Sequence, residues 1–549
     1  MRDLMILALL ACLLFTFMLG NRPLSVPDEG RYVEIPREMT VTGDYLTPRL
    51  NYVKYFEKPI LFYWLEAFSI KVFGLNEFTL RLWPALFGLF GVLGTALAGA
   101  RLFGRRTGLL AAAVLATSLL YFAFSRAIIL DMPVSVLLTL SLLCFLVGTH
   151  ESLGLSRRLY LYAFYAFAAL AVLAKGLIGI LIPGMVIGAW ILLLNEWRML
   201  RSLYLVTGLA LFFAIAAPWH ILVSRANADF FHFYFIQEHF LRYLTKMHSR
   251  YQPMWFFIPV VLFGLFPWSG FLVQAVKHNL PASWKDRHEH RDALFLLLWA
   301  ALVFLFFSAS SSKLVPYILP VFAPVALLIG RYLSDSWDRV DFPGVRIGYA
   351  IVLAASLLLA TAILALPVVW KSPEALVLGP YRQVFTITLA VGSVAAWLLS
   401  RYRGFSLAFI ALTVMSAIFL LEMNAAAPLV DAQSSAKPIA LALKARMKAN
   451  EEVACYGHYY QDLPVYLEQR VTVADWNGEL DYGRQAEDTG KWMIDGAALW
   501  KRWQEKAIMY VVMETGTYEN LKHTNPRLKF YPIAHTERHI ALCNKEVKP

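Results

Sequence analysis

The sequence has few charged residues: Asp, Glu, Lys and Arg make up only 16% of 549 residues, whereas soluble domains contain about a quarter. Hydrophobic residues make up 59%, and the mean hydropathy is +0.55. This composition excludes an ordinary soluble enzyme. The repeated long apolar runs predict that most of the chain is one helical bundle in lipid.

Cysteine is scarce as well. Cys12 and Cys144 lie inside apolar runs, and Cys455 and Cys543 lie in a polar tail. Neither pair has the spacing of a metal site, so the sequence contains no cysteine-based metal motif. In an oxidising compartment the tail pair could form a disulfide or remain as two thiols.

The first apolar run lacks a cleavage site. Residues 4–20 follow Arg2 as in a signal peptide, and Leu10-Ala11-Cys12 faintly resembles a lipoprotein site. The run continues past Cys12 and does not end in a small-residue pattern, so we predict a retained first membrane helix.

Apolar segments long enough to cross a bilayer recur throughout residues 1–423. Crossing takes about 17–25 residues, with some shorter segments tolerated. The segments are 4–20, 79–100, 109–124, 133–148, 159–174, 178–194, 203–223, 254–276, 293–309, 317–330, 347–370, 384–400 and 405–423. We therefore predict a polytopic α-helical membrane protein with about thirteen transmembrane helices in a 1–423 domain.

Basic residues are concentrated in the loops on one side of this bundle. The short opposite loops contain Arg126, Lys175, Lys313, Lys371 and Arg382. By the positive-inside rule the N-terminus is cytoplasmic, and an odd number of helices places the tail outside.

Three segments outside the bundle are predicted to be external. Loop one, 21–78, should contain a short helix opened by Ser25 and Pro27, a turn at 42–44 and an interfacial helix at 59–73. The loop 224–253 is rich in aromatic residues and His. The tail, 424–549, is predicted to be a small α/β domain with strands at 452–456, 465–473, 508–513 and 540–543 and helices at 434–449 and 497–506.

Loop one contains the adjacent carboxylates Asp28 and Glu29. Adjacent acids do not share a helical face, so one can point into a cleft while the other pairs with Arg31 or Arg37. The alternative is a charge pair favoured by the dipole at a helix N-terminus.

Lys58 lies at the start of the interfacial helix, and three more charged residues lie at predicted external helix ends: Asp131, Lys175 and Lys313. Each could be a site residue or a snorkelling anchor. Together with Asp28 they converge on one external face near headgroup level. Several lysines and few carboxylates at that depth suit lipid phosphates.

With these residues the sequence resembles a known family, the polyprenyl-phosphate-dependent glycosyltransferases of the C-type fold, which are related to protein O-mannosyltransferases. It looks most like the lipid A 4-amino-4-deoxy-L-arabinose transferases. The resemblance covers nearly the whole chain and is carried by Asp28-Glu29-Gly30-Arg31-Tyr32, Phe56-Glu57-Lys58-Pro59, Asp131, Ala174-Lys175-Gly176 and Lys313 with Tyr317-Ile318-Leu319-Pro320.

The resemblance implies roles for individual residues. The catalytic candidates are Asp28, Asp131 and Glu57. The substrate-binding candidates are Glu29, Tyr32, Tyr55, Lys58, Lys175, Arg242, Lys313 and Tyr317. Lys58 and Lys175 would contact the phosphate of the undecaprenyl carrier, and Asp28 would orient the acceptor or bind the amino group of the sugar.

The resemblance also suggests that Glu57, His239 and His458 could hold a divalent metal, zinc, as such a trio does in a close relative. Their separations in the sequence do not by themselves indicate zinc. His232 and His248 leave the choice of ligands open, and an ordinary hydrogen-bonded histidine is the alternative for each position. No nucleotide cofactor is expected.

The expected function is transfer of 4-amino-4-deoxy-L-arabinose from undecaprenyl phosphate to a lipid A phosphate, on the periplasmic face of a bacterial inner membrane. Membrane lipids are expected partners and nucleic acid is not. One rival is transfer of another carrier-linked sugar to a protein or polysaccharide hydroxyl, with Asp28 as base. The other is a transporter or flippase, which usually has matched halves; no internal repeat is visible here.

Overall fold

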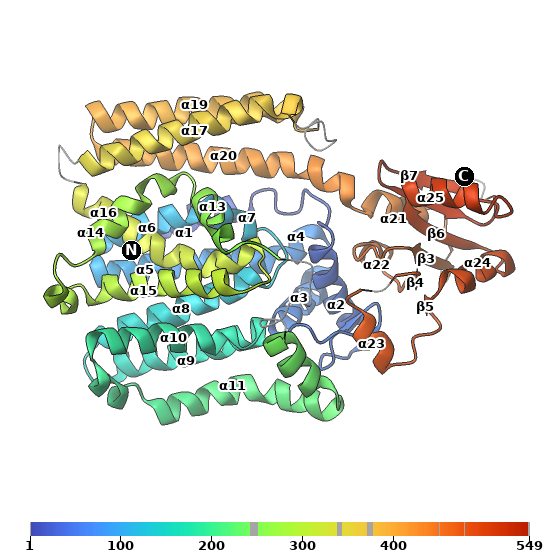
Figure 1. The fold of residues 1–549 in the computed structure, drawn as a ribbon, viewed down its shortest axis with the longest axis horizontal. Helices are drawn as coiled ribbons and strands as arrows, with labels where there is room; N and C mark the ends of the chain where they lie inside the picture. Colours follow the sequence, from blue (N-terminus) through green and yellow to red (C-terminus); the bar gives the residue numbers. More distant parts are fainter. Residues whose placement is uncertain are drawn as a thin grey trace. The chain divides into compact units, whose positions relative to one another are not determined.

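The computed structural model describes residues 2–241, 251–337, 343–369, 377–448, 451–476 and 478–546 (Figure 1). The chain forms two compact units. The first comprises Met1–Leu19, Glu57–Phe62 and Leu82–Ala425, and the second comprises Gly20–Phe56, Tyr63–Arg81 and Ala426–Pro549.

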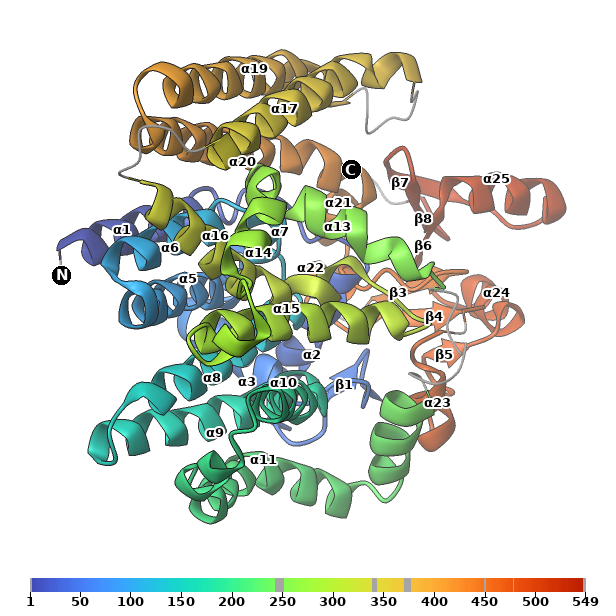
Figure 2. The same ribbon diagram turned by 60° about the vertical axis from the view of Figure 1, so that its left-hand side comes forward.

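The first unit is built of helices. Its α-helices are α1 (Arg2–Thr16), α5 (Leu82–Phe103), α6 (Arg105–Ala116), α7 (Leu119–Phe124), α8 (Asp131–His150), α9 (Leu155–Lys175), α10 (Ile178–Leu194), α11 (Leu205–Ala226), α13 (Phe257–Gly264), α14 (Leu272–Asn279), α15 (Arg291–Ala309), α16 (Phe322–Ser336), α17 (Pro343–Val369), α19 (Gly379–Tyr402) and most of α20 (Phe405–Ser434). The shorter helical turns are η1 (Trp197–Ser202), η2 (His232–Leu241), η3 (Met254–Phe256), η4 (Trp268–Phe271), η5 (Trp284–His288) and η6 (Val315–Val321). Helices α17 and α19 form a hairpin that runs beside α20 in both views (Figures 1 and 2).

Helical residues occupy all thirteen predicted segments as far as the structure describes them, but a count of thirteen membrane spans is not confirmed. Among the described residues nine helices are long and apolar enough to cross a membrane, or ten if one bent pair is a single span. Helix α1 has 15 residues and α10 has 17, and neither is among these nine helices.

Two other predicted segments are interrupted. Segment 109–124 breaks between α6 and α7, where the hydroxyls of Thr117 and Ser118 donate to backbone carbonyls of the preceding turn. Segment 254–276 bends by 106° between Gly264 and Trp268, and Pro267 lies within this break. Because proline cannot donate a backbone hydrogen bond, it favours such an interruption.

Helix α8 is mostly buried within the first unit, and small residues allow the helices around it to pack closely. A Cβ on Gly99 of α5 would lie 2.9 Å from the Cα of Gly108 in α6. A Cβ on Gly330 of α16 would lie 2.7 Å from the backbone nitrogen of Ala111. Small residues at such crossings are typical of helix packing in membranes.

The second unit combines most of loop one with the tail. Loop one forms α2 (Asp28–Thr42), β1 (Arg49–Leu50), β2 (Val53–Lys54), most of α3 (Leu61–Phe73) and α4 (Glu77–Leu80). The predicted turn at 42–44 is present, and Gly43 ends α2 with φ +76°. Helix α3 exposes Trp64, Phe68 and Phe73, as expected of an interfacial helix.

The tail is a small α/β domain, as predicted. Its helices are α21 (Lys437–Lys444), α22 (Leu463–Leu467), α23 (Asp481–Ala486), α24 (Gly496–Glu505) and α25 (Thr515–Thr524). Its strands are β3 (Glu452–Tyr456), β4 (Thr472–Ala474), β5 (Met493–Ile494), β6 (Met509–Glu514), β7 (Tyr531–His535) and β8 (His539–Cys543), in the order β5-β4-β3-β6-β8-β7. Strands β3 to β6 are parallel, and β7 and β8 are antiparallel.

One predicted strand of the tail is wrong. Residues 465–473 begin with the last turn of α22 and only end in β4, because Pro464 occupies the first turn of that short helix. The two tail cysteines lie on β3 and β8, with β6 between these strands, and both are free thiols.

Most of loop one belongs to the same compact unit as the tail, whereas the sequence placed it in the 1–423 domain. Polar contacts explain the difference. Asn51 donates to the carbonyl of Val471 and accepts from its N–H, and Arg49 forms an ion pair with Glu487. These contacts join residues more than four hundred positions apart.

Candidate active site

Asp131 and Lys175 lie together in the first unit. Asp131 is the first residue of α8, Lys175 is the last residue of α9, and the two form an ion pair. The ammonium of Lys175 also lies 4.5 Å from the centroid of the Tyr317 ring in η6. We call Asp131, Lys175 and Tyr317 the lysine cluster. Its two charged side chains are each 14% exposed, so water screens them little but a ligand can reach them.

The local sequence explains this geometry. Gly176 has φ +103° and ends α9 directly after Lys175. A cation at a helix C-terminus and an anion at a helix N-terminus are both stabilised by the helix dipoles. The cluster is therefore fixed by two helix ends and can present one ammonium to an anion.

Lys313 is also in the first unit, but its ammonium is used within the protein. It is 4% exposed and donates to the carbonyls of Gln252 and Ser310, at 2.8 and 2.5 Å. Burial lowers its pKa. Lys313 thus ties the turn before η6 to residue 252, and the substrate-binding role expected of it stays a prediction.

Glu57 and Lys58 are neighbours in the first unit as well. The Lys58 ammonium donates to the Glu57 carbonyl at 2.9 Å and lies 4.0 Å from the Glu57 carboxylate. Both side chains are mostly buried, 14% exposed for Lys58 and 16% for Glu57. This arrangement leaves a limited opening for a ligand.

The two acids of loop one have separate environments in the second unit. Asp28 is the first residue of α2, is 55% exposed and forms an ion pair with Arg31. Glu29 is buried between Arg22 and Arg81, at 3.0 and 2.6 Å. Burial opposes its ionisation, but the two guanidinium groups lower the pKa of Glu29 to about 2. Asp28 is thus the accessible acid, whereas Glu29 forms buried ion pairs that stabilise the fold.

The rest of the loop-one motif is packed. Arg31 is 6% exposed and pairs with Glu479 as well as Asp28. A Cβ on Gly30 would lie 2.6 Å from the backbone nitrogen of Asp462, so only glycine fits there. The Tyr32 ring lies 6.4 Å from that of Tyr63.

Tyr55, another predicted substrate ligand, is fully buried, 1% exposed, just after β2. Tyr32 is 9% exposed. Both tyrosines therefore pack inside the second unit.

Of the three predicted metal ligands, the structure describes the side chains of Glu57 and His458. Glu57 belongs to the first unit, and His458, which follows β3, belongs to the second. His239 lies in η2, and its side chain is outside the described part, as are Arg242 and His248 entirely. Within the described ranges, no group of three or more His, Cys, Asp or Glu residues could hold a metal ion.

Sequence reasoning did not identify several buried charges of the second unit. Glu66 on α3 is fully buried, and within the described part of the chain its carboxyl oxygens have no hydrogen-bond partner. Burial and the Glu29 carboxylate raise the pKa of Glu66, against the effect of Arg81. An acid in the middle of an apolar helix was the only available signal.

Arg126 was counted among external loop charges, but it is 4% exposed. It donates to the carbonyls of Leu14, Phe15 and Phe17 and to the side chain of Asn424. These carbonyls lie at the end of α1 and require donors, which the apolar run alone did not reveal.

Comparisons with known proteins agree with this architecture. Residues 4–234 match the family described as dolichyl-phosphate-mannose-protein mannosyltransferase, and residues 439–544 match the aminoarabinose transferase C-terminal domain. The undecaprenyl phosphate-alpha-4-amino-4-deoxy-L-arabinose arabinosyl transferase of Yersinia enterocolitica is 30% identical over 398 residues, 70% of this chain and 69% of the relative. The chain belongs to the aminoarabinose arabinosyl transferase family.

Solved structures of this family extend the match over nearly the whole chain. ArnT from Cupriavidus metallidurans in the apo state superimposes with a TM-score of 0.84 and 28% identity, covering 98% of this chain and 97% of that one. The same transferase bound to undecaprenyl phosphate superimposes with a TM-score of 0.85 and 28% sequence identity, covering 99% of each chain. The predicted resemblance and fold class are confirmed. As an arabinosyl transferase family member, the protein is a glycosyltransferase with several membrane spans.

Proposed function

We propose that the protein transfers 4-amino-4-deoxy-L-arabinose from undecaprenyl phosphate to a phosphate of lipid A. The observation that carries the proposal is the 30% identity, over 70% of the chain, to a relative named for this donor and sugar. The match over 99% of both chains to ArnT bound to undecaprenyl phosphate supports the same carrier.

The lysine cluster suits the carrier phosphate. In the donor, a bond joins the anomeric carbon of the sugar to a phosphate oxygen. As that bond breaks, its electron pair stays with the carrier, and negative charge develops on undecaprenyl phosphate. The Lys175 ammonium stabilises this charge in a partly buried site. Asp131 orients the ammonium through their ion pair, and the Tyr317 ring supports its other side.

The acceptor completes the exchange by forming a bond from a lipid A phosphate oxygen to the anomeric carbon. A phosphate monoester is already anionic near neutrality, since its second pKa is about 6. A strong general base is therefore unnecessary. In this proposal Asp28, the exposed acid of loop one, orients the acceptor or binds the amino group of the sugar.

A hydroxyl acceptor is the second candidate, because residues 4–234 match a protein mannosyltransferase family. In that case Asp28 would act as general base. Mass spectrometry of lipid A from cells with and without the chain tests the first proposal. Lipid A should carry the added sugar only when the chain is present, and unmodified lipid A in both samples would contradict it.

The proposed location is the bacterial inner membrane, with the N-terminus in the cytoplasm and the tail in the periplasm. The concentration of basic residues in one set of loops supports this orientation. Single cysteines introduced at exposed positions of the tail and of the opposite loops, labelled with a membrane-impermeant maleimide in whole cells, test it. Labelling confined to the opposite loops would reverse the orientation.

A divalent metal bound by Glu57, His239 and His458 stays a prediction that rests on the family resemblance. Elemental analysis of the purified protein and of His458→Ala tests it directly. The prediction is one bound zinc that the substitution removes. An equal metal content in both proteins would exclude His458 as a ligand.

A further inference from the structure

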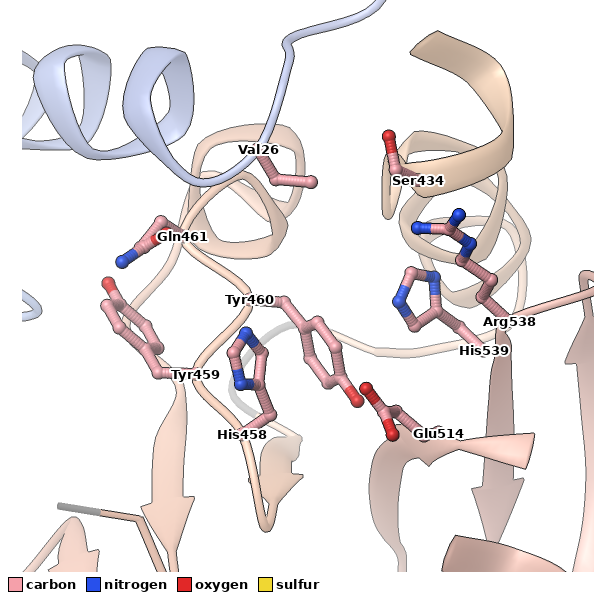
Figure 3. A pocket seen from close by; sticks show the side chains of 9 residues that line it. All are labelled: Val26, Ser434, His458, Tyr459, Tyr460, Gln461, Glu514, Arg538 and His539. Atoms are coloured by element: carbon pink, nitrogen blue, oxygen red, sulfur yellow. The ribbon is translucent and has the colours of Figure 1, made fainter. Parts of the chain in front are cut away.

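The second unit contains a polar pocket of about 150 Å³ (Figure 3). Its lining comes from loop one, the end of α20 and the tail. The lining residues are Val26, Ser434, His458, Tyr459, Tyr460, Gln461, Glu514, Arg538 and His539. All belong to the second unit, whereas the lysine cluster belongs to the first.

The pocket lies where the topology of the sheet favours ligand binding. Strand β3 pairs in parallel with β4 on one side and with β6 on the other, so the order of the strands reverses at β3. Residues 458–461 directly follow β3, and Glu514 is the last residue of β6. His539, the first residue of β8, is the antiparallel partner of Glu514. Ligands of open α/β sheets bind outside the carboxyl ends of the strands at such a switch point.

Two buried groups in the pocket lack partners. Tyr460 is 5% exposed and His539 is 6% exposed, and their ring centroids are 4.8 Å apart. Across the described ranges, the Tyr460 hydroxyl and the His539 Nδ1 have no hydrogen-bond partner. A buried polar group without a partner is costly and is uncommon in folded proteins. Both groups line the pocket, where a ligand would satisfy them.

The charges of the pocket restrict what it can bind. In Figure 3 the Glu514 carboxylate lies at the hydroxyl end of Tyr460, and Arg538 lies beside His539. A ligand with an anionic group toward Arg538 and with hydroxyl donors toward Glu514 meets both charges. The aromatic rings of His458, Tyr460 and His539 line the space between, with centroids 4.8 to 5.1 Å apart.

We propose that this pocket is a binding site for a phosphorylated sugar. The choice of ligand class rests on the proposed function, because both the donor and the acceptor of that reaction carry a phosphate on a sugar. The phosphate binds at Arg538 and His539, and the sugar hydroxyls bind at Glu514 and Tyr460. The shared chemistry admits a lipid headgroup or a free sugar phosphate.

Calorimetric titration of the full-length protein in detergent with glucose 1-phosphate tests this site without requiring turnover. We expect saturable binding that weakens about tenfold in Tyr460→Phe, which removes only the hydroxyl, and in Glu514→Gln. The matched control is Tyr518→Phe on α25, a residue that packs on Phe530 outside the pocket lining and should leave binding unchanged. Thermal unfolding confirms that each variant is folded.

Further titrations separate the sources and the alternatives. If lipid A in the same micelles displaces glucose 1-phosphate, the ligand is a lipid headgroup. If lipid A does not displace it, the ligand is a soluble sugar phosphate. No saturable heat, or equal affinity for inorganic phosphate, overturns the proposal. Transfer to lipid A without glucose 1-phosphate binding removes this site alone, whereas binding without transfer removes the proposed function alone.

Discussion

Lys175 and Asp131 form an ion pair between the last residue of α9 and the first residue of α8. Each charge lies at the helix end whose dipole favours it. The pair is therefore stable without substrate, and another face of the ammonium lies against the Tyr317 ring. A ligand phosphate meets a cation that is already positioned.

Removing the positive charge of Lys175 should abolish most turnover. In Lys175→Met the developing charge on the carrier loses the cation that the proposed function assigns to it, and kcat/KM for the carrier-linked donor should fall at least about a hundredfold. A transfer assay with purified protein measures it. The matched control is Lys277→Met, an exposed lysine in the last turn of α14, which should retain normal turnover. Normal turnover in Lys175→Met would remove Lys175 from the site.

The ring of Tyr317 should contribute separately. Tyr317→Leu removes the aromatic face under the ammonium, and the KM for the donor should rise roughly threefold to thirtyfold, the range of a cation–π contact. Tyr317→Phe keeps the face and should keep most of the affinity. A loss in Tyr317→Phe as large as in Tyr317→Leu would show that the hydroxyl matters instead.

Gly30 should be essential to the second unit. A Cβ at this position would lie 2.6 Å from the Asp462 nitrogen and 2.7 Å from the Gln461 carbonyl carbon, and backbone cannot move aside cheaply. Gly30→Ala should destabilise the protein by about 1–3 kcal/mol. Gly516→Ala on α25, where a Cβ meets nothing within 4 Å, is the control and should unfold at the wild-type temperature. Equal unfolding temperatures for both variants would contradict the close packing.

Glu29 should make stability depend on acid pH. Its pKa falls from 4.5 in the unfolded chain to about 2 in the fold. A lowered pKa means that the stabilisation is complete above pH 4.5 and is lost as the pH falls toward 2. The full effect is about 3 kcal/mol.

Thermal unfolding of the protein and of Glu29→Gln between pH 7 and pH 3 measures this dependence. The wild type should lose stability across this range more steeply than the variant. Glu29→Gln should also be less stable at pH 7, because it leaves buried Arg22 and Arg81 without their shared carboxylate. Glu505→Gln, an exposed acid at the end of α24, is the control. Parallel curves for Glu29→Gln and the wild type would contradict the assignment.

The sequence placed Asp131 and Lys175 on one face because each lies at the predicted external end of an apolar segment, and the family resemblance added Tyr317. Such a pattern cannot distinguish a lysine that faces ligand from one that binds carbonyls, which is why the role expected of Lys313 differs from its contacts. Hydropathy located the helical segments, but it did not reveal that α6 and α7 are separate or that Pro267 lies at a bend.

Contacts between residues far apart in the sequence could not be predicted from local sequence patterns. The pairing of Arg31 with Glu479 joins residues 448 positions apart, and no periodicity encodes it. The pocket around Tyr460 and His539 depends on the order of the strands, which brings the ends of β3, β6 and β8 together. Of its residues, only His458 was singled out in advance, as a metal ligand.

The most direct test of the account is transfer by the purified protein in detergent, given undecaprenyl phosphate-linked 4-amino-4-deoxy-L-arabinose and lipid A and followed by mass spectrometry. The account predicts lipid A carrying one added aminoarabinose, release of undecaprenyl phosphate, and loss of both products in Lys175→Met. Unmodified lipid A with a folded wild-type protein, or full product from Lys175→Met, would contradict it.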